Sequence, residues 1–139
     1  MPDKSGTSLI TRLDPPRLAS AVGYCQVTVA AGTRTVYVSG QVGIGPDGDL
    51  AGPDHHSQTH QAMHNLVIAL EAAGASIEDV AKATFYVVDY APEVMGSIFE
   101  ASAAVFGLDA PPMAVTLVGV AALADPAYLI EIEVTAVLA

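Results

Sequence analysis

The chain has few basic residues. Only 5 of its 139 residues are Lys or Arg, against 15 that are Asp or Glu, which gives a formal net charge of −10. A field of this sign repels a phosphate backbone, so the composition argues against nucleic acid as the main partner. The last arginine along the chain is Arg34 and the last basic residue of any kind is Lys82. Any anion-binding site built from the C-terminal part must therefore manage without a guanidinium of its own.

Cysteine is also nearly absent. Cys25 is the only one, which excludes an intrachain disulfide and a cysteine-based zinc site. No histidine or lysine adjoins it, which favours a small buried thiol over a reactive one. The uncharged run 110–124 is too short to span a membrane, and residues 1–8 include Asp3 and Lys4, unlike a signal peptide. We therefore expect a soluble cytoplasmic protein with no membrane partner.

Apolar residues, by contrast, are abundant. Hydrophobic residues make up 52% of the chain and charged residues 14%, a balance that excludes disorder. The length suits one domain over 1–139. The apolar content exceeds what a core of this size needs, and the surplus favours a buried interface between subunits.

Turn signals and the spacing of apolar residues divide the chain into six strands and two helices. The expected strands are 8–13, 24–30, 34–39, 80–88, 115–120 and 128–138, and the expected helices are 54–73 and 92–106. The short turn between the second and third strands favours a hairpin. The order β-β-β-α-β-α-β-β predicts an α+β domain in which both helices cover one face of a single mixed sheet. The other face is left bare, which favours closure against further subunits.

Few side chains suggest chemistry. His56, His60 and His64 are spaced four apart on the first expected helix, but no clear third ligand type accompanies them, so a solvated helix flank is favoured over a metal site. Glu131 lies within an apolar strand, where a carboxylate can manage the proton of a water molecule. Glu133 on the same strand face favours a solvent-facing strand instead, and the spacing supports both interpretations equally.

Several segments, in order along nearly the whole chain, resemble the RidA/YjgF family of reactive-intermediate (enamine/imine) deaminases, also called the endoribonuclease L-PSP family. These segments are 23–26, 36–41, 58–75, 79–84 and 130–133. The resemblance implies a chorismate-mutase-like fold and a homotrimer, with three sheets forming a central barrel and the helices outside. It also implies small-molecule clefts between neighbouring subunits. We expect no cofactor and no metal.

The resemblance also assigns individual residues to the cleft. Glu131 would be catalytic and position a water molecule. The residues expected to bind the ligand are Tyr24, Ser39, Gly40, Val115, Thr116 and Leu117.

One departure from the family pattern concerns its arginine. Deaminating members carry it in a Pro-Ala-Arg-Ser/Thr pattern before the fifth strand, and here Val115 stands at that position, or Met113 if the alignment shifts. In the family this guanidinium holds the substrate carboxylate, and neither side chain can supply that planar, bidentate contact. Arg12, Arg17 and Arg34 are the remaining guanidinium groups, none of them at the matching position.

Two functions remain open. The first is a hydrolase acting on a neutral imine or enamine, with Glu131 handling water and with imino-acid deamination weak or absent. The second is a non-catalytic or regulatory ligand-binding trimer. The apolar side chains that replace the arginine predict a preference for uncharged ligands in either case.

Overall fold

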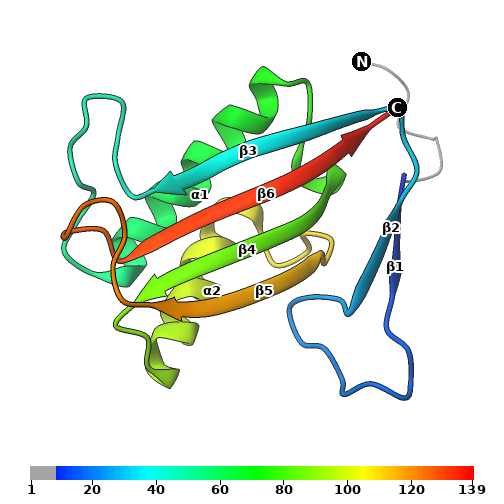
Figure 1. Cartoon of the computed structure of the whole chain (residues 1–139), viewed down its shortest axis with the longest axis horizontal. Helices are drawn as coiled ribbons and strands as arrows, with labels where there is room; N and C mark the ends of the chain where they lie inside the picture. Colours follow the sequence, from blue (N-terminus) through cyan, green and yellow to red (C-terminus); the bar gives the residue numbers. More distant parts are fainter. Residues whose placement is uncertain (1–8) are drawn as a thin grey trace.

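The computed structural model describes residues 9–139, so Ser8 of the expected first strand and the segment compared with a signal peptide lie outside it. Its elements are β1 (Ile10–Leu13), β2 (Val27–Ala30), β3 (Arg34–Val42), α1 (His55–Ala72), η1 (Ile77–Asp79), β4 (Val80–Val88), α2 (Pro92–Phe106), β5 (Ala114–Val120) and β6 (Ile130–Leu138). Figure 1 shows them along the chain. Neither helix in this part of the chain is long and apolar enough to cross a membrane.

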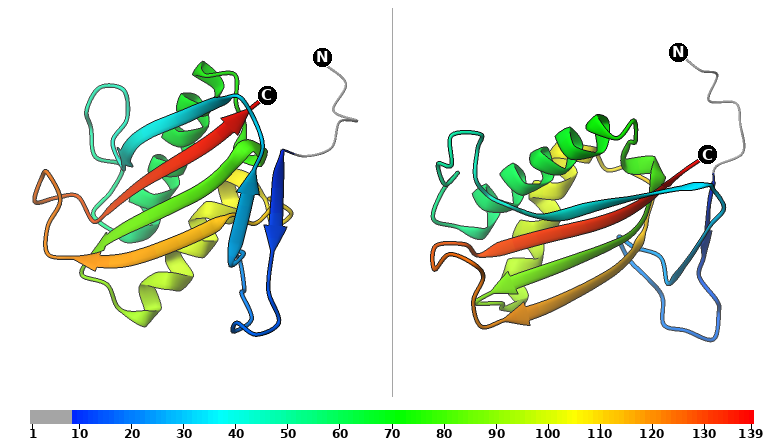
Figure 2. Two further views of the ribbon diagram at one scale, coloured as in Figure 1. Left: turned by 45° about the vertical axis from the view of Figure 1, so that its right-hand side comes forward. Right: turned by 45° about the horizontal axis from the view of Figure 1, so that its top comes forward.

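Four strands form the main sheet, in the order β3-β6-β4-β5. β6 pairs antiparallel with both β3 and β4, whereas β5 runs parallel to β4 after the crossover through α2. Both helices lie on one face of this sheet and the other face is open (Figure 2). The predicted α+β class, with two helices on one side, is confirmed.

The core lies between the sheet and the helices. α1 contributes Leu66 and Leu70, and β6 contributes Ile130 and Ile132, all buried almost completely. The apolar stripe of the helix and the alternate residues of the strand meet there because these are the periods at which each element exposes one face. The residues between them on β6 consequently point to the open face.

The predicted hairpin between the second and third strands is wrong. β2 pairs only with β1, and the two form a separate two-stranded sheet beside the main one (Figure 1). The intervening turn is bound to the end of β6: Thr33 donates its N–H to the carbonyl of Leu138, and a Cβ on Gly32 would lie 2.3 Å from the same oxygen. β6 pairs with one edge of β3, and no strand within residues 9–139 pairs with the other, so β2 turns away from β3 and pairs with β1 instead.

The other boundaries follow the predictions closely. β4 and α2 begin and end at the predicted residues, and α1 lies within the predicted 54–73. The second strand is shorter than predicted because Cys25 pairs instead with Ala114, at the start of β5. The third is longer, since it continues to Val42 past an irregularity between Val38 and Gln41.

The apolar surplus does not lie on the open face. That face carries mainly polar side chains, because β4 presents Lys82, Thr84 and Tyr86 there and β6 presents Glu131 and Glu133. The large apolar side chains exposed to solvent lie mostly on the β1–β2 hairpin with its loop and on the helices: Leu13, Leu18, Val22, Val29, Ile68, Met95 and Phe99. An apolar sheet face therefore cannot be the reason for subunit closure.

Candidate functional site

Glu131 lies against the irregularity in β3. An ideal Cβ placed on Gly40 would be 2.0 Å from Oε1 of Glu131 and 2.6 Å from its Cδ, so only glycine leaves room for this carboxylate. Glu131 is half-buried, and Val42 of β3 and Tyr86 of β4 flank it in register. The structure thus brings together Glu131 and Gly40, with Ser39 next to them in the strand.

A polar hollow of about 300 Å³ adjoins this position on the open face. Its walls come from the three strands β3, β6 and β4, and its polar lining residues are Tyr37, Ser39, Lys82, Thr84, Glu133 and Thr135. Lys82 donates from Nζ to Oγ1 of Thr116 over 2.7 Å. Of the predicted ligand-binding residues, Ser39 lines this hollow, and Thr116 is connected to it through the hydrogen bond from Lys82.

Tyr86 and Glu133 form a short hydrogen bond on the same face. The phenol Oη donates to Oε1 of Glu133 over 2.5 Å. This bond, followed by burial and by the charges of Glu133 and Glu131, raises the pKa of Tyr86 above its ordinary value. The phenol therefore remains protonated throughout the neutral range and can donate to Glu133.

The two other predicted residues of β5 lie on the opposite side of the sheet. Val115 and Leu117 pack against the core beneath the helices, whereas Thr116 between them is on the open face. Within one chain, the side chains of Val115 and Leu117 are therefore separated from Glu131 by the sheet itself. A single chain does not assemble all of the predicted residues into one cavity.

Tyr24 lies at the start of β5. The next residue, Cys25, donates its backbone N–H to the carbonyl of Met113 over 3.0 Å, and Cys25 itself is only 1% exposed. Burial and the charge of Asp14 raise the pKa of the Cys25 thiol, and Arg12 opposes them. The prediction that Cys25 is a buried thiol is confirmed.

Arg12 and Arg34 donate hydrogen bonds to backbone carbonyls. Arg12 donates from Nε to the carbonyl of Pro112 over 2.5 Å and from Nη2 to that of Glu78 over 3.3 Å, which fastens β1 to the segment before β5. Arg34 donates from Nε to the carbonyl of Ala139 over 3.2 Å. These contacts hold their guanidinium groups at backbone carbonyls, away from Glu131.

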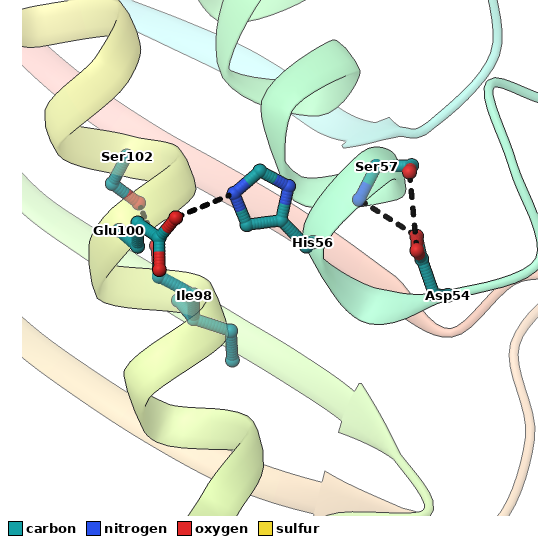
Figure 3. A network of polar contacts seen from close by, with 6 residues as sticks. All are labelled: Asp54, His56, Ser57, Ile98, Glu100 and Ser102. Atoms are coloured by element: carbon teal, nitrogen blue, oxygen red, sulfur yellow. Dashed lines mark hydrogen bonds and ion pairs between the residues drawn. The ribbon is translucent and has the colours of Figure 1, made fainter.

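The histidines belong to the outside of the helix pair. Nε2 of His56 lies 3.5 Å from Oε1 of Glu100, so α1 and α2 are bridged at this point (Figure 3). His60 and His64 are exposed, and the described residues contain no group of three His, Cys, Asp or Glu side chains placed to hold a metal ion. At the start of α1, hydrogen bonds from Ser57 hold the pKa of Asp54 below its usual range.

Gln58 positions the strand that carries Glu131, although sequence patterns provide no physical reason to single it out. Its fully buried amide donates to the carbonyls of Gly52 and Ala127, each over 3.0 Å, and accepts the N–H of Leu129 over 2.8 Å. Gln58 therefore connects α1 to two loops, the one that precedes α1 and the one that precedes β6. The contact with Leu129 lies two residues before Glu131. A buried glutamine is visible as a polar residue on an apolar helix, but its partners depend on the tertiary fold.

We expect Gln58→Ala to lower the free energy of unfolding by about 2–4 kcal/mol, because two carbonyls and one N–H lose their buried partner. Urea unfolding measures this change. Gln61→Ala on the same helix is the control: its amide donates only to Asn65, and it should cost less than about 1 kcal/mol. Equal losses for the two variants would contradict the assigned role of Gln58.

Comparison with known proteins shows the family to which this chain belongs. The sequence profile described as endoribonuclease L-PSP matches residues 15–138. The chain belongs to this family, also called RidA/YjgF. A solved relative, the Rid-family protein YyfB of unknown function from Yersinia pestis, is 35% identical, covers 94% of this chain and 99% of its own, and superposes with a TM-score of 0.87.

Two curated relatives match this RidA/YjgF chain over shorter segments. The human 2-iminobutanoate/2-iminopropanoate deaminase is 34% identical over 86 residues, which is 60% of this chain and 61% of the human protein. A RutC family protein of Pyrococcus abyssi is 40% identical over 55 residues, which is 39% of this chain and 43% of that protein. The match therefore spans less than two thirds of either relative.

Proposed function

We propose that this chain is a RidA-family hydrolase that acts on a neutral imine or enamine, with Glu131 as the catalytic carboxylate. The observation that carries the proposal is the close approach of the Glu131 carboxylate to Gly40 of β3, which only a residue without a Cβ permits. The family to which the chain belongs includes an imine deaminase among its members. The valine at position 115 argues for a substrate without a carboxylate.

The proposed role of Glu131 is general acid–base catalysis, in which its carboxylate transfers protons from water to the imine nitrogen. Water adds to the carbon of the C=N bond, and the carboxylate takes a proton from that water and passes it to the nitrogen. The second proton of that water, now on the hydroxyl of the carbinolamine, passes through the carboxylate to the nitrogen as the C–N bond breaks, so that the imine and one water become a carbonyl compound and an amine or ammonia. Positioned general acid–base groups of this kind contribute about 10²–10⁴-fold to rate.

The cleft is proposed to form between subunits of a homotrimer. Tyr24 lies beside the start of β5, two strands away from Glu131 on β6, so we propose that a second copy brings a Tyr24 side chain to Glu131. We expect a trimer by light scattering at micromolar concentration. A monomer under these conditions would contradict the inter-subunit cleft.

A small molecule is the proposed ligand, despite the ribonuclease in the family's name. The net charge is −10, and within residues 9–139 Arg12 and Arg34 are engaged with backbone carbonyls, so that Arg17 and Lys82 are too few to form a basic stripe for a phosphate backbone. This supports the small-molecule assignment over RNA.

Hydrolysis of a neutral imine tests the proposal. A flavin amine oxidase acting on benzylamine supplies the imine in situ, and ammonia release is followed with and without the protein. We expect acceleration by the native chain and a loss of about 10²-fold or more in Glu131→Gln. No acceleration of this or any other neutral imine, with the ligand still bound, would favour the non-catalytic binder instead.

A further inference from the structure

The polar hollow on the open face contains two opposite charges that do not pair with each other. Lys82 lies opposite Thr135 and Glu133 lies opposite Thr84, so the two are diagonal neighbours on adjacent strands. Long side chains at this spacing reach each other. Among residues 9–139, however, Lys82 and Glu133 do not form an ion pair with each other.

Each charge is held by a neutral hydroxyl instead. The Lys82 ammonium donates to Thr116, and the Glu133 carboxylate accepts from Tyr86. An ammonium has three donors and a carboxylate has two acceptor oxygens, so both groups retain hydrogen-bonding capacity toward the hollow. The remaining polar walls are hydroxyls, from Tyr37, Ser39, Thr84 and Thr135.

We propose that this hollow binds a small zwitterion with the size and charge pattern of a polar amino acid such as serine. A ligand with an anionic group alone meets Lys82 favourably but is repelled by Glu133 and by Glu131 one row away. A ligand with an ammonium alone is repelled by Lys82. Only a ligand that carries both charges satisfies both walls, and the hydroxyls complement its polar atoms.

This site goes beyond the proposed hydrolase activity, because it uses Lys82 and Glu133 rather than Glu131. In the proposed trimer the open faces surround a central barrel, so the hollow would face its lumen and a ligand would enter from an end. A volume of about 300 Å³ is at the lower end of small-molecule pockets. An amino acid therefore fits inside the hollow with room to spare, and the pair of opposite charges, rather than size, is what selects it.

Calorimetric titration of the native protein with L-serine, L-lactate and ethanolamine tests the charge pattern. These probes carry both charges, the carboxylate alone and the ammonium alone. We expect serine to bind most tightly. Lys82→Gln and Glu133→Gln keep a hydrogen-bonding group at each position. Each should lower the affinity for serine by about ten-fold.

Two charge-matched variants serve as controls. Arg17→Gln removes one positive charge from an exposed loop, and Glu100→Gln removes one negative charge from α2, where its side chain is 79% exposed. Neither should change serine affinity. Equal binding of serine and either single-charge probe, or equal effects of the hollow variants and the controls, would overturn the proposal.

The proposal for the hollow and the proposal of hydrolase activity can each be contradicted without the other. If serine affinity falls in Glu131→Gln but not in Lys82→Gln, the zwitterion occupies the cleft and the hollow proposal is wrong. If imine turnover is absent while Lys82→Gln still weakens serine, the hydrolase proposal is wrong and the hollow stands. We expect Lys82→Gln to retain imine turnover.

Discussion

Gly40→Ala is expected to lower imine turnover by about 10²-fold or more, although the substitution adds only one methyl group. The added Cβ would lie 2.0 Å from Oε1 of Glu131, so the carboxylate must leave its place. A displacement of about 1 Å at a catalytic group is sufficient for such a loss. The measurement is the rate of ammonia release from the neutral imine.

The matched control is Gly45→Ala, in the connection that follows the same strand. A Cβ at Gly45 meets nothing within 4 Å, so this variant should retain turnover. The double variant Gly40→Ala/Glu131→Gln should be no slower than Glu131→Gln alone, because both changes remove the same function. A folded Gly40→Ala protein with native turnover would show that the observed carboxylate position has no part in catalysis.

The second large effect concerns imino acids. An imino acid made by an amino-acid oxidase from 2-aminobutyrate should be deaminated at least about 30-fold less efficiently than by the human relative, because no arginine stands at position 115 to hold its carboxylate. Ammonia release at equal protein concentration measures the difference. The neutral imine, tested in parallel, shows that the protein preparation is active.

An acceleration of imino-acid hydrolysis equal to that of the human enzyme would contradict this prediction. The structure would then direct attention to Lys82, the basic side chain on the open face. In that case Lys82→Gln should lower the deamination rate, whereas Arg17→Gln should not.

Local sequence patterns were sufficient for the elements of the main sheet. The ends of β4 agree with the prediction and those of α2 agree with its approximate bounds, because β-branched residues in one and Pro92 at the start of the other are local signals. The pairing of β2 was not, since the contact that diverts it joins Gly32 to Leu138. No local pattern reveals that two residues so distant in sequence meet.

The candidate site shows the same division. Strand alternation predicts that Glu131 and Glu133 share a face, and they do. The same alternation along β5 separates Val115 from Thr116, but which of them faces the helices depends on the register with β4. The role of Gln58 depends on loops that meet only in the folded chain, and so does the space for Glu131 beside Gly40.

The contact between Arg12 and Pro112 has a consequence for synthesis. Residues 100 positions apart must meet before β1 and β2 are fastened, so the first part of the chain to be made reaches its final place only after β5 has been made. Until then Cys25 lacks the backbone of Met113 as its partner. We therefore expect its thiol to be more open to oxidation in the unfinished chain than in the folded protein, where it is buried.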